Sequence, residues 1–156
     1  MGFGLMAIQL LGTGAMAGDT SLERPQSFLI EMGGRAGSFS LQYDFHVAEA
    51  VAFGAGLETL SNNGSALWIF PVFVNAYFAP GPHRPYFTAG VNFAAGSGSY
   101  TTTSYFNSTG VGSVNAGAGY EYRGSNGLLF RVTGYGLVAG STVTPWAGVS
   151  IGAALP

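Results

Sequence analysis

Two histidines are the first candidates for catalysis in this sequence, because it contains no cysteine and no lysine. His46 or His83 could act as the general base of a hydrolytic or lipid-modifying reaction, together with a serine and an acid. Serines are plentiful, but no spacing of histidine, serine and acid stands out along the chain. Two histidines far apart in sequence also make a poor metal site, and without cysteine there is no disulfide or thiol chemistry. The sequence therefore predicts no catalytic residue, no metal and no cofactor.

Six charged residues form a second candidate set, because each falls on the polar side of a segment with alternating character. Successive side chains of a β-strand point to opposite faces, so these charges would share one enclosed face. Glu121 and Arg131 are expected to be diagonal neighbours across a hairpin that turns near Ser125. Buried charges must be paired, so a structural polar network is the first interpretation, and an ion or proton path is the alternative. The predicted network comprises Glu31, Asp44, Glu58, Glu121, Arg123 and Arg131.

The composition is unusual for a soluble domain of 156 residues, a length that suits one domain. Charged residues make up 8% of the chain, against about 25% in ordinary soluble proteins. The net charge of −2 and five scattered arginines offer no basic surface for nucleic acid. A membrane helix needs about 20 consecutive apolar residues, and after residue 17 Gly, Ser, Thr, Asn and Pro interrupt every apolar stretch. Because a bilayer admits only helices or closed barrels, a β-barrel is left.

The first 17 residues are expected to be a signal peptide. An apolar segment ends in Ala15-Met16-Ala17, which matches the small-x-small pattern of a signal-peptidase site. No basic residue precedes this segment, and the alternative is a buried N-terminal strand or helix. Cleavage after Ala17 would leave residues 18–156 as a single barrel domain.

From residue 27 onward, stretches of about 10 alternating residues are separated by turn formers, which is typical of a transmembrane barrel. In the second stretch, for example, Phe39, Leu41 and Tyr43 oppose Ser40 and Gln42. A soluble sandwich would also alternate, but its outer face would carry more charges. The fold class predicted is all-β, an eight-stranded antiparallel transmembrane barrel with up-and-down connections. Its strands are expected at residues 27–33, 36–45, 48–59, 66–79, 84–95, 110–123, 127–138 and 143–154.

Two local features qualify this pattern. Pro71 removes a ladder hydrogen bond from the fourth strand, and Leu67, Ile69 and Phe73 share a face with Asn75, so we expect a bulge or irregularity there. Aromatic residues cluster near strand ends, as in interfacial girdles, although packing in a soluble β-core is the alternative. These aromatic residues are Trp68, Phe70, Tyr77, Phe78, Tyr86, Phe87, Tyr120, Tyr122 and Trp146.

An even-stranded barrel has both termini on the periplasmic side, which orients the loops. The external loops are then expected near residues 34–35, 60–65, 96–109 and 139–142. His46 and His83 are expected to be solvated residues of periplasmic turns. The longest external segment is predicted to be a contact surface, through Tyr100, Tyr105 and Phe106.

The stretch GGRAGSFSLQYDF at residues 33–45, with FPV at 70–72 and PYFTAG at 85–90, resembles the outer-membrane β-barrel family of OmpA/OmpX-like small barrels. The resemblance spans roughly residues 26–154 and lies in the overall pattern, so it implies the fold and transfers no site. Such barrels usually end in an aromatic residue that the barrel assembly machinery reads, whereas this chain ends Ala154-Leu155-Pro156.

These observations predict a non-enzymatic outer-membrane protein of a Gram-negative bacterium, with a role in envelope structure or surface interaction. A narrow channel for ions or small solutes is the alternative, and a lipid-modifying enzyme is the second alternative. The expected partners are outer-membrane lipids, lipopolysaccharide and the barrel assembly machinery, with no nucleic acid. The barrel is expected to be monomeric.

Overall fold

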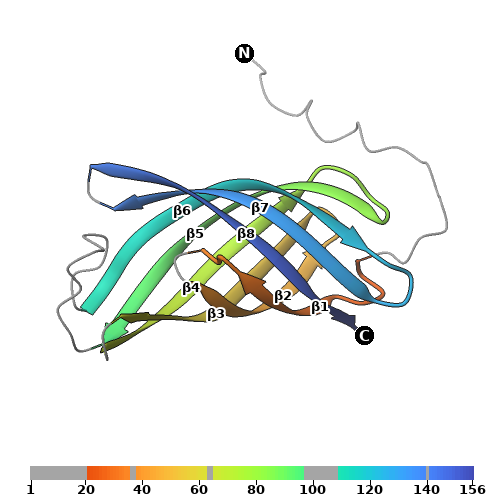
Figure 1. The fold of residues 1–156 in the computed structure, drawn as a ribbon. Coiled ribbons are helices and arrows are strands. Elements are labelled where there is room, and N and C mark those ends of the chain that lie inside the picture. Colours follow the sequence, from red (N-terminus) through yellow and green to blue (C-terminus); the bar gives the residue numbers. More distant parts are fainter. Residues whose placement is uncertain (1–20, 36–37, 63–64, 97–108, 140) are drawn as a thin grey trace, which may run out of the picture.

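The computed structural model describes residues 21–35, 38–62, 65–96, 109–139 and 141–156, and these form a closed antiparallel barrel (Figure 1). Each strand pairs with the next along the chain, and β8 pairs with β1 to complete the circle. All eight predicted strands are confirmed, each within three residues at both ends. Their bounds are β1 Gln26–Met32, β2 Phe39–Ala48, β3 Val51–Asn62, β4 Ser65–Tyr77, β5 His83–Gly96, β6 Thr109–Arg123, β7 Leu128–Ala139 and β8 Thr142–Leu155.

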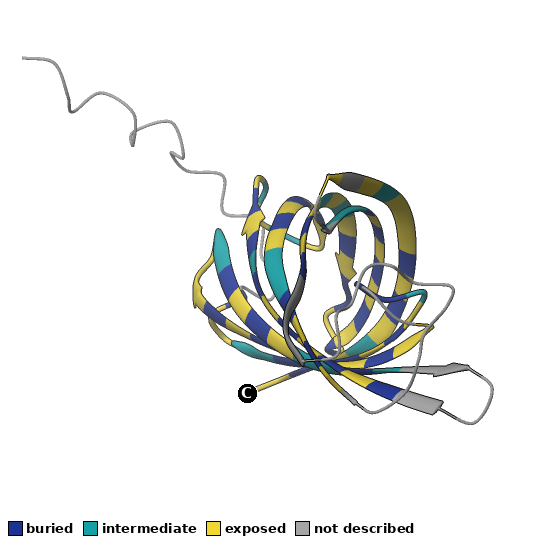
Figure 2. Cartoon of the chain, turned by 90° about the vertical axis from the view of Figure 1, so that its left-hand side faces the viewer, coloured by how far each residue is buried: buried dark blue, intermediate teal, exposed yellow. Residues whose placement is uncertain are grey.

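Alternation along each strand produces the two faces of the barrel wall, visible as alternating buried and exposed bands in Figure 2. In β2, Ser40, Gln42 and Asp44 are buried, while Phe39 and Leu41 are exposed, as the sequence pattern predicts. The wall has no free edge because every strand has two hydrogen-bonded neighbours. In the part of the chain that the structure describes, no helix is long and apolar enough to cross a membrane.

Glycines opposite inward aromatic rings allow the rings to lie against the wall. Phe73 pairs with Gly54 on β3 and with Gly90 on β5, its partners on the two sides. A Cβ on Gly54 would lie 2.2 Å from the Phe73 ring, and one on Gly90 would lie 2.8 Å from the Phe73 Cβ. Tyr86 repeats the arrangement against Gly119 on β6, where a Cβ would lie 2.6 Å from the ring. These positions require glycine because a neighbouring side chain fills the space.

The expected irregularity in β4 takes a milder form than a bulge. The β3–β4 ladder stops after Ala55 and Val72 and resumes with Glu58 and Ile69 in the same register. Its interruption lies at Pro71, which has no N–H to donate. The register shifts of the described ladders lie elsewhere, between His46 and Ala48 and between Asn92 and Phe93.

The turn predicted around His46 is wrong. The second strand continues to Ala48, and the connection to β3 consists of Glu49 and Ala50. His46 is therefore part of β2 and continues the inward series of Gln42 and Asp44.

Candidate functional site

Glu121 lies at the centre of a cluster of buried charges near one end of the barrel interior. It is the direct ladder partner of Arg84 on β5 and of Arg131 on β7. The sequence predicts Arg131 as a diagonal neighbour, whereas in the structure it lies directly opposite Glu121. Arg131 Nε donates to Glu121 Oε2 at 2.6 Å, and Arg131 Nη2 forms an ion pair with the same oxygen at 2.6 Å. Arg84 Nη1 lies 3.3 Å and Arg123 Nε 3.5 Å from Glu121 Oε1. Tyr77 adds a hydroxyl donor at 3.1 Å, so one carboxylate links side chains of four strands, β4 to β7.

Asp44 extends this cluster across the interior. It forms an ion pair with Arg131 Nη2 and accepts a hydrogen bond from Asn75 Nδ2 at 3.4 Å. β2, β4 and β7 are thereby linked by polar side chains that are at most 2% exposed. Such pairing offsets the cost of taking charges out of water.

Arg35 lies in the connection between β1 and β2, where the sequence predicts an external loop, but its side chain does not point outward. Its side chain is 1% exposed and extends into the barrel, with the guanidinium carbon 3.5 Å from the centroid of the Phe73 ring. Arg35 Nη1 donates to Thr88 Oγ1 at 2.9 Å and to Asn115 Oδ1 at 3.1 Å. Its backbone N–H donates to Glu58 Oε1 at 3.0 Å. One residue between β1 and β2 therefore contacts β3, β4, β5 and β6.

Glu31 has a different environment, because neutral donors surround its carboxylate. Tyr135 donates from its hydroxyl at 2.8 Å and Ser150 at 3.3 Å, and the Gln42 amide donates as well. Gly148 leaves room for this carboxylate, since a Cβ there would lie 2.5 Å from Glu31 Oε1. The negative charge is therefore held by hydrogen bonds from uncharged groups.

His46 was expected to be a solvated turn residue, and the structure contradicts this. The ring is 1% exposed and stacks on Tyr77 with centroids 5.2 Å apart. Its Nε2 lies 3.1 Å from Nη2 of Arg84, which also donates to the Glu49 carbonyl at 2.9 Å. Arg84 lies 3.8 Å over the Tyr77 ring as well. Strand parity could have predicted both, because His46 follows Gln42 and Asp44, and Arg84 precedes Tyr86 and Thr88, on their strands.

Two residues of the expected aromatic girdle also face inward. Tyr77 and Tyr86 are 5% and 2% exposed, and their ring centroids lie 5.3 Å apart. The Tyr86 hydroxyl hydrogen-bonds to Thr133 Oγ1 at 2.5 Å. The other members of that set point outward, namely Trp68, Phe70, Phe78, Phe87, Tyr120, Tyr122 and Trp146.

The six charged residues predicted to share the interior all lie there, each at most 2% exposed. Arg123 marks one end, where it donates to the Arg24 carbonyl at 2.9 Å and to Ser27 Oγ at 3.2 Å. With Arg35 and Arg84 added, the buried charges are four carboxylates and four guanidinium groups, so they balance. No cluster of metal-ligating side chains occurs among the described residues. Tyr100, Tyr105 and Phe106, the predicted loop contacts, lie outside the described residues.

Comparison with known proteins supports the fold. No protein-family model matches the sequence, and no curated protein matches it. The structure is similar to the crystal structure of the N-terminal β-barrel domain of OprF from Pseudomonas aeruginosa, with a TM-score of 0.56 and 14% sequence identity. The similarity covers 82% of this chain and 93% of that one. It agrees with the eight-stranded fold that the sequence resemblance implies, and at this identity it transfers no residue role.

Proposed function

We propose that this chain is a non-enzymatic β-barrel of the bacterial outer membrane with a role in envelope structure or surface interaction. The observation that carries the proposal is the reversed distribution of side chains, with charges inside and large apolar groups outside. Every one of the eight strands exposes at least one large apolar side chain. Water disfavours such a continuous apolar surface, whereas the hydrocarbon core of a bilayer accommodates it. Examples, one from each strand in order, are Phe28, Leu41, Phe53, Val72, Phe87, Val114, Phe130 and Ile151.

The interior supports a structural role over transport. Its four carboxylates and four guanidinium groups balance in number. The ion pair of Asp44 with Arg131 reaches across the interior, and Glu121 pairs with three arginines of its own and the two adjacent strands. Groups held in this way keep their positions, because breaking one pair leaves an uncompensated buried charge.

The polar lining also favours a narrow ion path as the second candidate. Four buried polar atoms have no hydrogen-bond partner in the described structure and would be satisfied by water, namely Arg35 Nε, Asp44 Oδ1, His46 Nδ1 and Arg123 Nε. Conductance in planar bilayers separates the two candidates. We expect the refolded protein to give no single-channel steps, and regular steps would favour the path.

The lipid-modifying alternative has less support. His46 contacts Arg84 and Tyr77 inside the barrel, and His83 contacts Tyr120 and Tyr122 at its rim. A hydrolytic triad instead needs a serine and a carboxylate beside the histidine. We therefore expect the mass of lipid A to stay unchanged on expression, whether or not His46 and His83 are replaced by alanine.

The charge distribution bears on the proposed partners. The chain's cationic side chains are five arginines, of which four are buried inside and Arg24 is half-buried. The predicted external loops bring no cation toward lipopolysaccharide phosphates, so contact with that lipid would be chiefly apolar. The barrel assembly machinery remains a proposed partner, as do a monomeric state and a cleaved leader.

The deciding experiment expresses the chain with a working leader and compares unheated and boiled outer-membrane fractions on SDS gels. A closed barrel has no edge from which to unravel, so we expect an SDS-resistant band whose mobility changes on heating. A soluble protein with one mobility would contradict the proposal.

A further inference from the structure

Positive charge is almost absent from the outer surface of this barrel. The chain has no lysine, and four of its five arginines point into the interior. The fifth, Arg24, is half-buried and packs against Gly127 at the β6–β7 turn. His46 is enclosed as well. Among the described residues, His83 is therefore the exposed side chain of the outer face that can take up a proton and become a cation.

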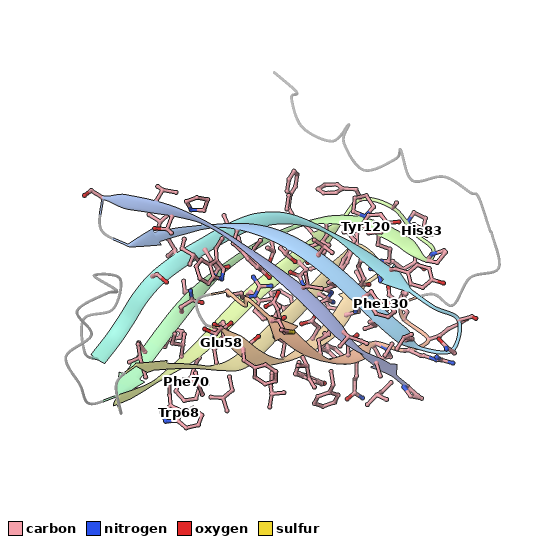
Figure 3. All side chains as sticks on the ribbon, viewed as in Figure 1. Glu58, Trp68, Phe70, His83, Tyr120 and Phe130 are labelled. Atoms are coloured by element: carbon pink, nitrogen blue, oxygen red, sulfur yellow. The ribbon has the colours of Figure 1, made fainter. Side chains whose placement is uncertain are left out.

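His83 is held between two tyrosines of the neighbouring strand. It is the first residue of β5 and the direct ladder partner of Tyr122 on β6. Its ring centroid lies 5.3 Å from that of Tyr122 and 6.0 Å from that of Tyr120. His83 Nδ1 is hydrogen-bonded to the Tyr120 hydroxyl. Figure 3 shows His83 and Tyr120 together at one end of the barrel wall.

This hydrogen bond orients the imidazole toward a ligand. When the phenol donates to Nδ1, the neutral ring carries its proton on Nε2, which is then a donor directed away from Tyr120. When the ring is protonated, both nitrogens donate, Tyr120 accepts, and the Tyr122 ring lies within cation–π distance. Either form therefore offers Nε2–H to an acceptor, and the protonated form prefers an anion.

The carboxylate of the neighbouring strand β6, Glu121, points into the barrel and pairs there with arginines. The titratable groups facing it are the Tyr120 and Tyr122 phenols. The connection to β4 at residues 79–82 is Ala-Pro-Gly-Pro, and the adjacent Arg84 points into the barrel. No ion pair to His83 occurs among the described residues, so an anion that pairs with it is expected from outside the protein.

The position of His83 at one end of the barrel wall indicates which kind of anion would bind there. Phe78 and Phe87 form an exposed edge-to-face pair, with ring centroids 4.8 Å apart, and Phe87 follows His83 by four residues on β5. Exposed aromatic rings at a strand end are typical of the membrane–water interface, where the lipid phosphates lie. We propose that His83, Tyr120 and Tyr122 form a binding site for the phosphate of an anionic phospholipid headgroup. This inference rests on the proposed membrane location and specifies one lipid contact.

The test measures lipid selectivity by native mass spectrometry of the folded protein in detergent, with equimolar phosphatidylglycerol and phosphatidylcholine. At pH 5.5 we expect the wild type to retain phosphatidylglycerol at least about threefold over phosphatidylcholine, because an anionic headgroup is attracted to a cationic or donating side chain at the interface. His83→Gln should remove the preference. Tyr120→Phe, which keeps the ring and loses the hydroxyl, should reduce the preference. Equal retention of both lipids by the wild type at pH 5.5 would overturn the site.

A relocated histidine provides the matched control. Val47 is exposed near the end of β2, so the double variant His83→Gln with Val47→His carries a histidine near the same rim without the tyrosine pair. We expect it to show no preference for phosphatidylglycerol. Restored preference would mean that any cation at the rim suffices, and the site would be wrong.

Two further measurements show which claim is wrong if the lipid preference is absent. Displacement of phosphatidylglycerol by equimolar inorganic phosphate would indicate a site for soluble phosphate and overturn the lipid assignment, so we expect none. Unheated and boiled gels of the same preparations test the barrel itself. An SDS-resistant barrel without lipid preference contradicts only the site, whereas absence of the heat-dependent shift contradicts the proposed function.

Discussion

At the scale of single residues, the interior holds its acids in two different ways. Glu121 faces three arginines, whereas Glu31 accepts hydrogen bonds from Tyr135, Ser150 and Gln42. Removing a charge from an ion-pair cluster leaves its partners buried and uncompensated, while removing a charge among neutral donors loses hydrogen-bond strength alone. The two sites should therefore respond differently to the same substitution.

Glu121→Gln should lower the free energy of unfolding by about 3–5 kcal/mol, because Arg84 and Arg123 lose their counter-charge and Arg131 keeps only Asp44. The measurement is urea unfolding of the refolded barrel in lipid vesicles. Glu31→Gln is the matched control, with an expected cost of about 1–3 kcal/mol. Equal losses in the two variants would mean that the arginine cluster does not act as an ionic unit.

At the scale of the strands, aromatic side chains and glycines of neighbouring strands are matched in register. Phe73 on β4 fits between Gly54 and Gly90, and Arg35 stacks on its ring. The register of the strands thus positions the ring that holds the central arginine. A methyl group added under that ring would disturb the wall and the interior network together.

Gly90→Ala should destabilise the barrel by about 1–3 kcal/mol, because its Cβ would lie 2.6 Å from the Val72 carbonyl oxygen. Gly134→Ala is the control, because the nearest atom to its added Cβ would be the Ala118 carbonyl oxygen, 3.9 Å away. We expect the control to change stability by less than about 0.5 kcal/mol. The temperature at which the SDS-resistant band is lost reports both effects, and similar temperatures for the two variants would contradict the packing argument.

At the scale of the whole molecule, the barrel has a charged interior within an apolar outer wall. Val72 lies near the middle of β4 and Val143 near one end of β8, and both side chains are exposed. If the outer wall faces lipid, a charge on it should cost more at mid-depth than at the rim. If it faces water, neither charge should matter.

Val72→Arg should therefore reduce the stability of the barrel in vesicles by about 2–4 kcal/mol, and Val143→Arg by about 0–1 kcal/mol. Urea unfolding of both variants measures the difference. Near-neutral effects at both positions would contradict a bilayer around the wall and favour a water-facing surface.

Much of the fold could be predicted from the sequence, because alternation is a local property. Residues two apart share a face whatever the rest of the chain does, so the inward positions of Asp44, Glu121 and Arg131 could be read directly. The same alternation along β2 and β5 also indicates that His46 and Arg84 point inward. They were missed because the predicted second strand ended one residue before His46 and because Arg84 was assigned to neither face.

The sequence by itself determined the number of strands and the side of the wall on which most residues lie. Tertiary structure decided which residues meet, because closure brings together strands that are far apart in the chain. Arg35 shows this most clearly, since Phe73, Thr88 and Asn115 come from three different strands. A side chain in a connection has no alternation to direct it inward. Its position depends on the enclosed polar space, which exists only after β8 has paired with β1.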